Sequence, residues 1–161
     1  MITFGIESNG RLENTAIYYN GEQLGGVREV FLNMDENGTF DAIITYEGKD
    51  KKLYTKAIFE DYLENVKVRP PSFTEEEASR LKLLLVDSDG DINNTSLTLN
   101  NESLDGVTEL FLHIKSGKTD ERAGGVRGLF GGEKQADPTT FRAEVTFRYD
   151  NGSTETERIF A

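Results

Sequence analysis

Residues 20–34 read NGEQLGGVREVFLNM, and residues 100–114 read NNESLDGVTELFLHI. Each stretch is a polar turn followed by a segment in which apolar and polar residues alternate. The two stretches lie within a longer repeat, because residues 6–34 align with residues 86–114 with 12 of 29 positions identical. We interpret this similarity as an internal duplication, in which each copy is one structural unit of the fold.

A second block extends the repeat. Residues 40–59 align with residues 141–160, with 6 of 20 positions identical. Residues 35–39 form a short connection in the first copy, whereas residues 115–140 take their place in the second. The second copy therefore carries a long insertion at a position where the first has a tight turn.

The alternation predicts which face of each strand is buried. Val30, Leu32 and Met34 lie on one face of the strand expected at residues 27–34, and a period of two is typical of a half-buried strand. Asn20-Gly21 predicts a hairpin turn, because both residues tolerate a positive φ. The sequence therefore predicts an all-β fold made of two tandem homologous domains, each a small antiparallel β-sandwich or barrel.

The predicted boundaries follow from the repeat. Residues 1–59 form the first β repeat, residues 60–82 a linker with short helices, and residues 83–161 the second β repeat. In the linker, apolar residues from Phe59 to Val66 have helical spacing. The sequence from Thr74 to Glu77 has the spacing of a capping box, which predicts a second short helix.

Composition limits the possible functions. The net charge of −11 argues against binding to a nucleic acid backbone. The chain has no cysteine, and the longest apolar run, residues 83–86, is far too short to span a bilayer. The first residues do not resemble a signal peptide, so we expect a cytoplasmic or virion protein that a signal peptide does not secrete.

No pattern predicts catalysis, a cofactor or a dedicated metal site. Asp87, Asp89 and Asp91 alternate as at the start of a calcium loop, but Ile92 stands where an EF-hand requires glycine. The stretch is therefore either a hairpin turn or a weak calcium site. The single histidine, His113, matches Asn33 in the first copy and is expected at the surface. We predict that the protein is not an enzyme.

Two features are candidates for partner binding. The insertion at residues 115–140 is rich in glycine, and its residues Val126, Arg127, Leu129 and Phe130 are unusual for a plain linker. It is a docking loop, a mobile hairpin tip or a segment that packs on the first repeat. Phe31 and Phe111 interrupt the polar faces of their strands. They either pack against neighbouring elements or form a contact surface.

One resemblance bears on function. Residues 19–30, with their Tyr-Asn-Gly-Glu turn and Gly-Val-Arg-Glu-Val strand, resemble small β-rich accessory and structural proteins of bacteriophages. The resemblance implies a non-enzymatic assembly protein, such as a capsid decoration or connector subunit, which contacts capsid or tail subunits through the Gly-rich loop. Homo-oligomers are possible under this hypothesis. The alternative is a soluble cytoplasmic protein-binding module or an inhibitor of a host enzyme.

Overall fold

The computed structural model describes residues 1–116 and 140–160, which form two antiparallel sheets. The seven-stranded sheet has the order β10-β9-β8-β1-β2-β3-β7 and the six-stranded sheet the order β13-β12-β11-β4-β5-β6. The strands of the first sheet are β1 (Ile2–Ser8), β2 (Ala16–Tyr19), β3 (Glu22–Gly25), β7 (Lys67–Val68), β8 (Lys82–Ser88), β9 (Ser96–Leu99) and β10 (Glu102–Ser103). Those of the second are β4 (Val27–Asp35), β5 (Phe40–Glu47), β6 (Leu53–Ala57), β11 (Val107–Lys115), β12 (Thr140–Arg148) and β13 (Thr154–Arg158). The all-β prediction is confirmed.

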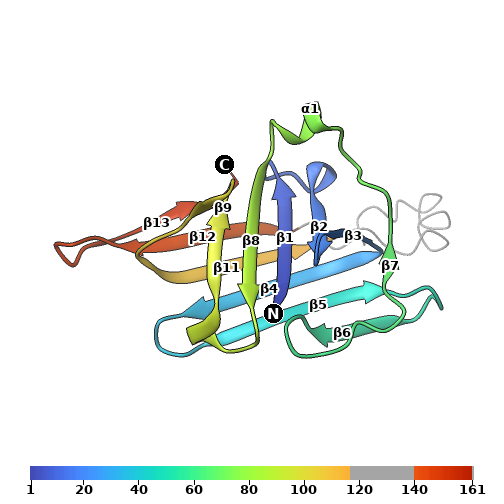
Figure 1. Cartoon of the computed structure of the whole chain (residues 1–161), viewed down its shortest axis with the longest axis horizontal. Coiled ribbons are helices and arrows are strands. Elements are labelled where there is room, and N and C mark those ends of the chain that lie inside the picture. The colour runs from blue at the N-terminus through green and yellow to red at the C-terminus, as the bar shows by residue number, and fades with distance from the viewer. Residues whose placement is uncertain (117–139, 161) are drawn as a thin grey trace, which may run out of the picture.

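The two sheets are stacked, and the strands of one run across those of the other (Figure 1). The alternation predicted for β4 holds, because Val30, Leu32 and Met34 are buried between the sheets. Their counterparts in β11, together with Phe4 and Ile6 of β1, belong to the same apolar core. A single core therefore joins both sheets and both halves of the chain.

Each sheet contains strands from both sequence copies. Strands β8, β9 and β10 of the second copy continue the sheet begun by β1, β2 and β3, and β11, β12 and β13 continue the sheet of β4, β5 and β6. This arrangement differs from two self-contained tandem sandwiches. The physical reason is burial: a unit of about 60 residues covers little apolar surface alone, and pairing β1 with β8 and β4 with β11 closes one larger core.

Two strand pairs join the copies, β1 with β8 and β4 with β11, and in both pairs a residue lies opposite its own counterpart in the repeat. In the pairing of β4 with β11, Leu32 lies opposite Leu112, which is its own counterpart in the repeat. In the pairing of β1 with β8, Gly5 lies opposite Leu85, again its counterpart. This is the pairing expected of two units related by a twofold axis, where residue i of one unit contacts residue j of the other and the reverse.

Repeated residues form repeated turns. The hydroxyl of Ser8 is buried and accepts a hydrogen bond from the Gly10 N–H at 3.0 Å, while Thr15 Oγ1 lies 2.8 Å from it. Ser88 makes the same contacts with Gly90 and Thr95, at 3.0 and 2.7 Å. Each turn leads into a short 3-10 helix, η1 (Leu12–Asn14) or η2 (Ile92–Asn94). The shared polar residues of the repeat are thus turn-forming residues.

The linker differs from the prediction in its first part. The helix expected between Phe59 and Val66 is absent; the chain makes turns that bury Ile58, Phe59 and Leu63, and then forms β7. Strand β7 (Lys67–Val68) then pairs with β3, so the chain reaches the sheet edge through turns that bury Phe59 and Leu63 in the core and not through a helix. The second predicted helix exists as one turn, α1 (Glu75–Ala78).

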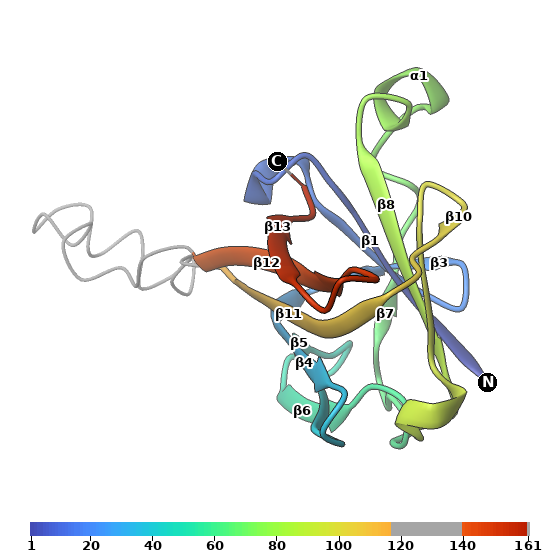
Figure 2. The same ribbon diagram turned by 90° about the vertical axis from the view of Figure 1, so that its left-hand side faces the viewer.

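Helix α1 begins with the predicted capping box. Thr74 Oγ1 accepts a hydrogen bond from the Glu77 N–H at 3.1 Å, and the Glu77 carboxylate accepts one from the Thr74 N–H at 3.0 Å. The helix projects away from the sheets in both views of the ribbon (Figures 1 and 2). In the part of the chain that the structure describes, no helix has the length and apolar character needed to cross a membrane.

Candidate functional site

An aromatic cluster lies on the outer face of the six-stranded sheet, opposite the core. Phe31 of β4 and Phe111 of β11 meet edge to face, with ring centroids 5.7 Å apart and planes at 88°. His113 lies opposite Phe31 in the strand register and meets it edge to face at 5.6 Å. The Arg142 guanidinium lies over the Phe111 ring, 4.6 Å from its centroid. We call Phe31, Phe111, His113 and Arg142 the aromatic patch.

The polar groups of the patch are paired with carboxylates. His113 Nε2 lies 2.6 Å from Glu29 Oε2, and Arg142 Nη2 lies 2.9 Å from Glu144 Oε1. These side chains are half exposed, so the pairs themselves add little stability. Their effect is on position, because each pair holds a ring or a guanidinium against the two phenylalanines.

The patch is open to solvent within the described residues. Phe31 and Phe111 are both half-buried, and Ile43, which lies opposite Phe31 on β5, is 39% exposed. Among residues 1–116 and 140–160, the neighbouring side chains of Glu29, Arg142 and Glu144 are also partly exposed, which agrees with an outer face that solvent reaches. The patch therefore places aromatic side chains from both halves of the chain on one surface.

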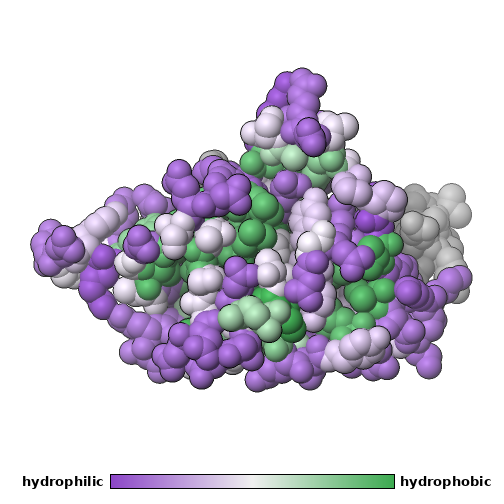
Figure 3. Space-filling model, in the orientation of Figure 1, coloured by the Kyte–Doolittle hydropathy of each residue, from purple (hydrophilic) through white to green (hydrophobic). Residues whose placement is uncertain are grey.

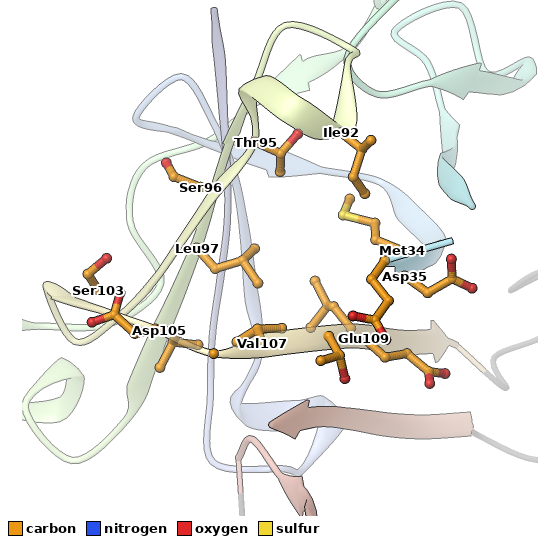
Figure 4. Close-up of a pocket in the computed structure, with 15 residues that line it drawn as sticks. Met34, Asp35, Ile92, Thr95, Ser96, Leu97, Ser103, Asp105, Val107 and Glu109 are labelled. Atoms are coloured by element: carbon orange, nitrogen blue, oxygen red, sulfur yellow. The ribbon is translucent and has the colours of Figure 1, made fainter. Parts of the chain in front are cut away.

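A second feature is a groove between the sheets on the side of the second copy. It holds about 360 Å³ and is lined by residues from the end of β4, from η2, from β9, and from β10, β11 and the segment that connects them. Met34, Ile92, Leu97 and Val107 extend into it from four different elements (Figure 4). We call it the β9–β11 groove.

The groove has a filled counterpart in the first copy. Leu97 and Leu104, which line the groove, are partly exposed, whereas the matching Ile17 and Leu24 are 7% and 5% exposed. Figure 3 shows hydrophobic surface to the left of the centre, where β9 lies in front of β11 and β12. The two copies have corresponding strands, but the apolar residues at this position are more deeply buried in the first copy than in the second.

Residues 62–72 provide the cover in the first copy. Leu63 is buried in the core, and the Tyr46 hydroxyl donates a hydrogen bond to the Glu64 carbonyl at 2.7 Å. Strand β7 pairs with β3, and the Arg69 N–H donates to the Gln23 carbonyl at 3.0 Å. No described residue plays this part in the second copy, so β10 remains an edge strand of its sheet.

The rim of the groove is acidic. Four of its lining residues are acids, and none is lysine, arginine or histidine; the acids are Asp35, Glu36, Asp105 and Glu109. The Arg148 guanidinium lies beside Glu36, with Nη1 2.7 Å from Oε2, and lowers the pKa of that carboxyl. Hydrogen bonds from the backbone of Thr39 lower the pKa of Asp35. These two carboxylates are therefore negatively charged at neutral pH.

The stretch from Asp87 to Asp91 runs from the end of β8 into a turn that begins at Asp89. Asp89 Oδ1 accepts a hydrogen bond from the Asp91 N–H at 3.0 Å, and Asp91 Oδ1 accepts one from the Asn93 N–H at 2.9 Å. Asp87 accepts a hydrogen bond from the Thr3 hydroxyl on β1. Across the described ranges, no group of three or more histidine, aspartate or glutamate side chains is arranged to hold a metal ion.

The sequence-based candidates divide into two sets. Phe31 and Phe111 lie in direct contact on the outer face, next to His113. The Gly-rich candidates fall outside the described residues; they are Val126, Arg127, Leu129 and Phe130. The expectation of a docking loop therefore stays a prediction.

Sequence reasoning missed the β9–β11 groove. A signal was present in the repeat, because the buried Ala16 and Gln23 of the first copy correspond to the exposed Ser96 and Ser103 of the second. Similarly, Tyr46 corresponds to Phe147, which lacks the hydroxyl that binds the linker in the first copy. Where a buried residue of the first copy corresponds to an exposed residue of the second, the surface at that position is covered in the first copy and open in the second.

Comparison of the chain with models of protein families, with curated proteins and with solved structures gives no match.

Proposed function

We propose that this chain is a non-enzymatic assembly protein that binds a partner protein through the aromatic patch. The observation that supports the proposal is the contact between Phe31 and Phe111, which places one partly exposed aromatic ring from each copy on the two central strands of the sheet. Protein interfaces concentrate their binding energy in a few aromatic and arginine side chains near the centre of the contact. Arg142, stacked on Phe111, completes that set of residue types.

The proposal includes a gene duplication, because the pairing of the two copies is what brings Phe31 and Phe111 together. An ancestral β unit that paired with a second copy of itself, and whose gene was then doubled and fused, explains why Leu32 pairs with its counterpart Leu112. The patch lies beside this pair on the same two strands. A partner bound there contacts both halves at once, which suits a protein that connects or decorates parts of a larger particle.

The class of partner follows from the resemblance to bacteriophage accessory proteins. We propose capsid or tail subunits as the partners, with the chain acting as a decoration or connector subunit. Ile43 widens the apolar contact beside Phe31, and the pairing of the Arg142 guanidinium with Glu144 reduces the cost of removing water from these two charged groups.

The test measures co-sedimentation of the protein with candidate capsid and tail particles. A double variant, Phe31→Ala with Phe111→Ala, is expected to weaken incorporation by about tenfold or more. The control carries Tyr62→Ala with Val68→Ala, which removes two side chains that are 84% and 52% exposed and lie outside the six-stranded sheet. Incorporation that is equal for both variants would contradict the proposal. Binding to an isolated host enzyme, and to no particle, would favour the inhibitor alternative.

A further inference from the structure

We propose that the β9–β11 groove binds an extended segment of a partner protein in which apolar residues alternate with lysine or arginine. The segment adds a strand to the free edge of β10, antiparallel to it, and places an apolar side chain in the groove. This site differs from the aromatic patch, which lies on the outer face of the six-stranded sheet, although Glu109 borders both. It therefore adds to the proposed function and does not depend on it.

The first copy contains the precedent for this mode of binding. Its β3 edge is covered by β7, with Leu24 opposite Val68 and Gly25 opposite Lys67. Residues 66–69 read Val-Lys-Val-Arg, so apolar and basic residues alternate. Strand addition of this kind supplies backbone hydrogen bonds for affinity and side-chain pockets for specificity.

The register of the first copy predicts which contacts the second copy offers. Leu104 corresponds to Leu24, so an apolar residue of the partner would lie opposite Leu104, as Val68 does opposite Leu24. Asp105 corresponds to Gly25, so a lysine at the place of Lys67 would lie opposite a carboxylate. The second copy thus has a carboxylate, Asp105, where the first copy has a glycine without a side chain.

The rest of the groove supports the same choice of partner. Leu97 and Leu104 are partly exposed in a space of about 360 Å³, which is room for an apolar side chain such as Leu63 of the first copy. Four carboxylates line the rim with no basic residue among the lining residues, and since Glu36 is paired with Arg148, the other three remain to attract a basic segment. An acidic rim around an apolar pocket favours a basic, partly apolar segment through charge complementarity.

Among the residues that the structure describes, no strand pairs with the outer edge of β10. In the first copy, the Gln23 carbonyl accepts the Arg69 N–H, and the Gln23 side chain binds Ser72 with two hydrogen bonds of 2.8 Å. Ser103 corresponds to Gln23 and is exposed on β10, the last strand of its sheet. An exposed strand edge is a template for a further strand.

The test uses a fluorescein-labelled synthetic peptide with the sequence of residues 62–72, YLENVKVRPPS, and the full chain. Fluorescence anisotropy is expected to rise to saturation as the protein is added. Replacing Lys67 and Arg69 of the peptide by glutamate is expected to weaken binding by about tenfold or more. In an NMR titration of the chain, the shifts are expected at Leu97, Ser103 and Leu104.

Protein variants locate the site. Asp105→Lys with Glu109→Lys changes two exposed side chains and is expected to weaken peptide binding by about tenfold or more. Glu22→Lys with Glu75→Lys makes the same change in net charge away from the groove and is expected to leave binding within about twofold. Leu104→Lys is expected to abolish binding, and circular dichroism checks that this variant folds.

Several results would overturn the proposal. One is the absence of peptide binding at protein concentrations up to about 1 mM, which corresponds to a negligible affinity. Another is equal peptide binding by Asp105→Lys with Glu109→Lys and by the charge control Glu22→Lys with Glu75→Lys. A concentration-dependent dimer of the chain that Asp105→Lys with Glu109→Lys abolishes would place a second copy in the groove instead. The variant Phe31→Ala with Phe111→Ala is expected to bind the peptide normally, so failure of the patch and failure of the groove are distinguishable.

Discussion

Leu32 of β4 lies directly opposite Leu112 of β11, its counterpart in the sequence repeat, and neither side chain has any exposed surface. The pair therefore lies where the two halves of the chain meet inside the core. Because β4 and β11 are adjacent central strands of one sheet, neither half can lose this contact without exposing the core of the other. The two copies are expected to unfold together.

Truncation of either leucine tests this coupling. Leu32→Ala and Leu112→Ala are each expected to lower the free energy of unfolding by about 2–5 kcal/mol, because each leaves a cavity in a closed core. The measurement is urea denaturation followed by circular dichroism, with one transition in every variant. The double variant is expected to depart from the sum of the single changes, since the two side chains belong to one pair. Two separate transitions, with only one affected by each substitution, would show that the halves are independent domains.

The buried serines offer a matched pair of substitutions. Ser8→Ala and Ser88→Ala each remove a buried hydroxyl that accepts a turn N–H and bonds a threonine hydroxyl, and each leaves these two partly buried groups without that bond. Both are expected to cost about 1–3 kcal/mol, and the two values are expected to agree within about 1 kcal/mol. Urea denaturation gives both numbers. A large difference between them would mean that the two turns, though alike in geometry, do not contribute alike to stability.

Local sequence patterns predicted much of the fold. The face of β4 that carries Leu32, the turn at Asn20-Gly21 and the capping box at Thr74 all depend on residues close together in sequence. Asn20 also has a role that the hairpin pattern did not reveal, because its side chain accepts a hydrogen bond from the Thr3 N–H at 2.9 Å. Local rules therefore identified the elements but not every contact between them.

Contacts between distant segments were not predictable in the same way. The partner of β4 could have been a strand of its own copy or of the other, and alternation alone does not distinguish them. The linker residues Phe59 and Leu63 have helical spacing, yet both are buried in the shared core by turns, and the chain becomes extended only at β7, where it pairs with β3. The aromatic patch was half predicted: Phe31 and Phe111 were identified by their position on a polar face, whereas their mutual contact depends on the pairing of the two copies.

The buried hydroxyl of Tyr46 predicts that the folded state loses stability at alkaline pH. Its hydroxyl donates to the Glu64 carbonyl, and burial, with a smaller contribution from the nearby Glu64 charge, raises its pKa to about 12. An unfolded tyrosine loses its proton near pH 10, so the folded state holds the proton more tightly between pH 10 and 12. The stabilising contribution of the neutral tyrosine is complete below pH about 10 and is lost as the pH rises towards 12.

The variant Tyr46→Phe separates this effect from general alkaline unfolding. It is expected to lower stability at pH 7 by about 1 kcal/mol through the lost hydrogen bond, and to show a shallower loss between pH 9 and 12. Phe147 occupies the matching position of the second copy, so the ring is compatible with this site. Urea denaturation across the pH range is the measurement, and Tyr62→Phe, at an exposed tyrosine, is the control. An unchanged pH dependence in Tyr46→Phe would exclude this role for Tyr46.

The unequal cover of the two copies predicts unequal costs at matched leucines. Leu24 is buried beneath residues 62–72, whereas Leu104 is partly exposed in the β9–β11 groove. Leu24→Ala is expected to lower the free energy of unfolding by about 2–4 kcal/mol, and Leu104→Ala by about 1 kcal/mol, because less apolar surface is lost from the core. Thermal and urea denaturation of both variants give the comparison. Addition of the peptide of residues 62–72 is expected to stabilise the parent chain and to have little effect on Leu104→Ala, since the bound segment would need that side chain. Equal costs for the two leucines without peptide would mean that the groove is already covered in solution.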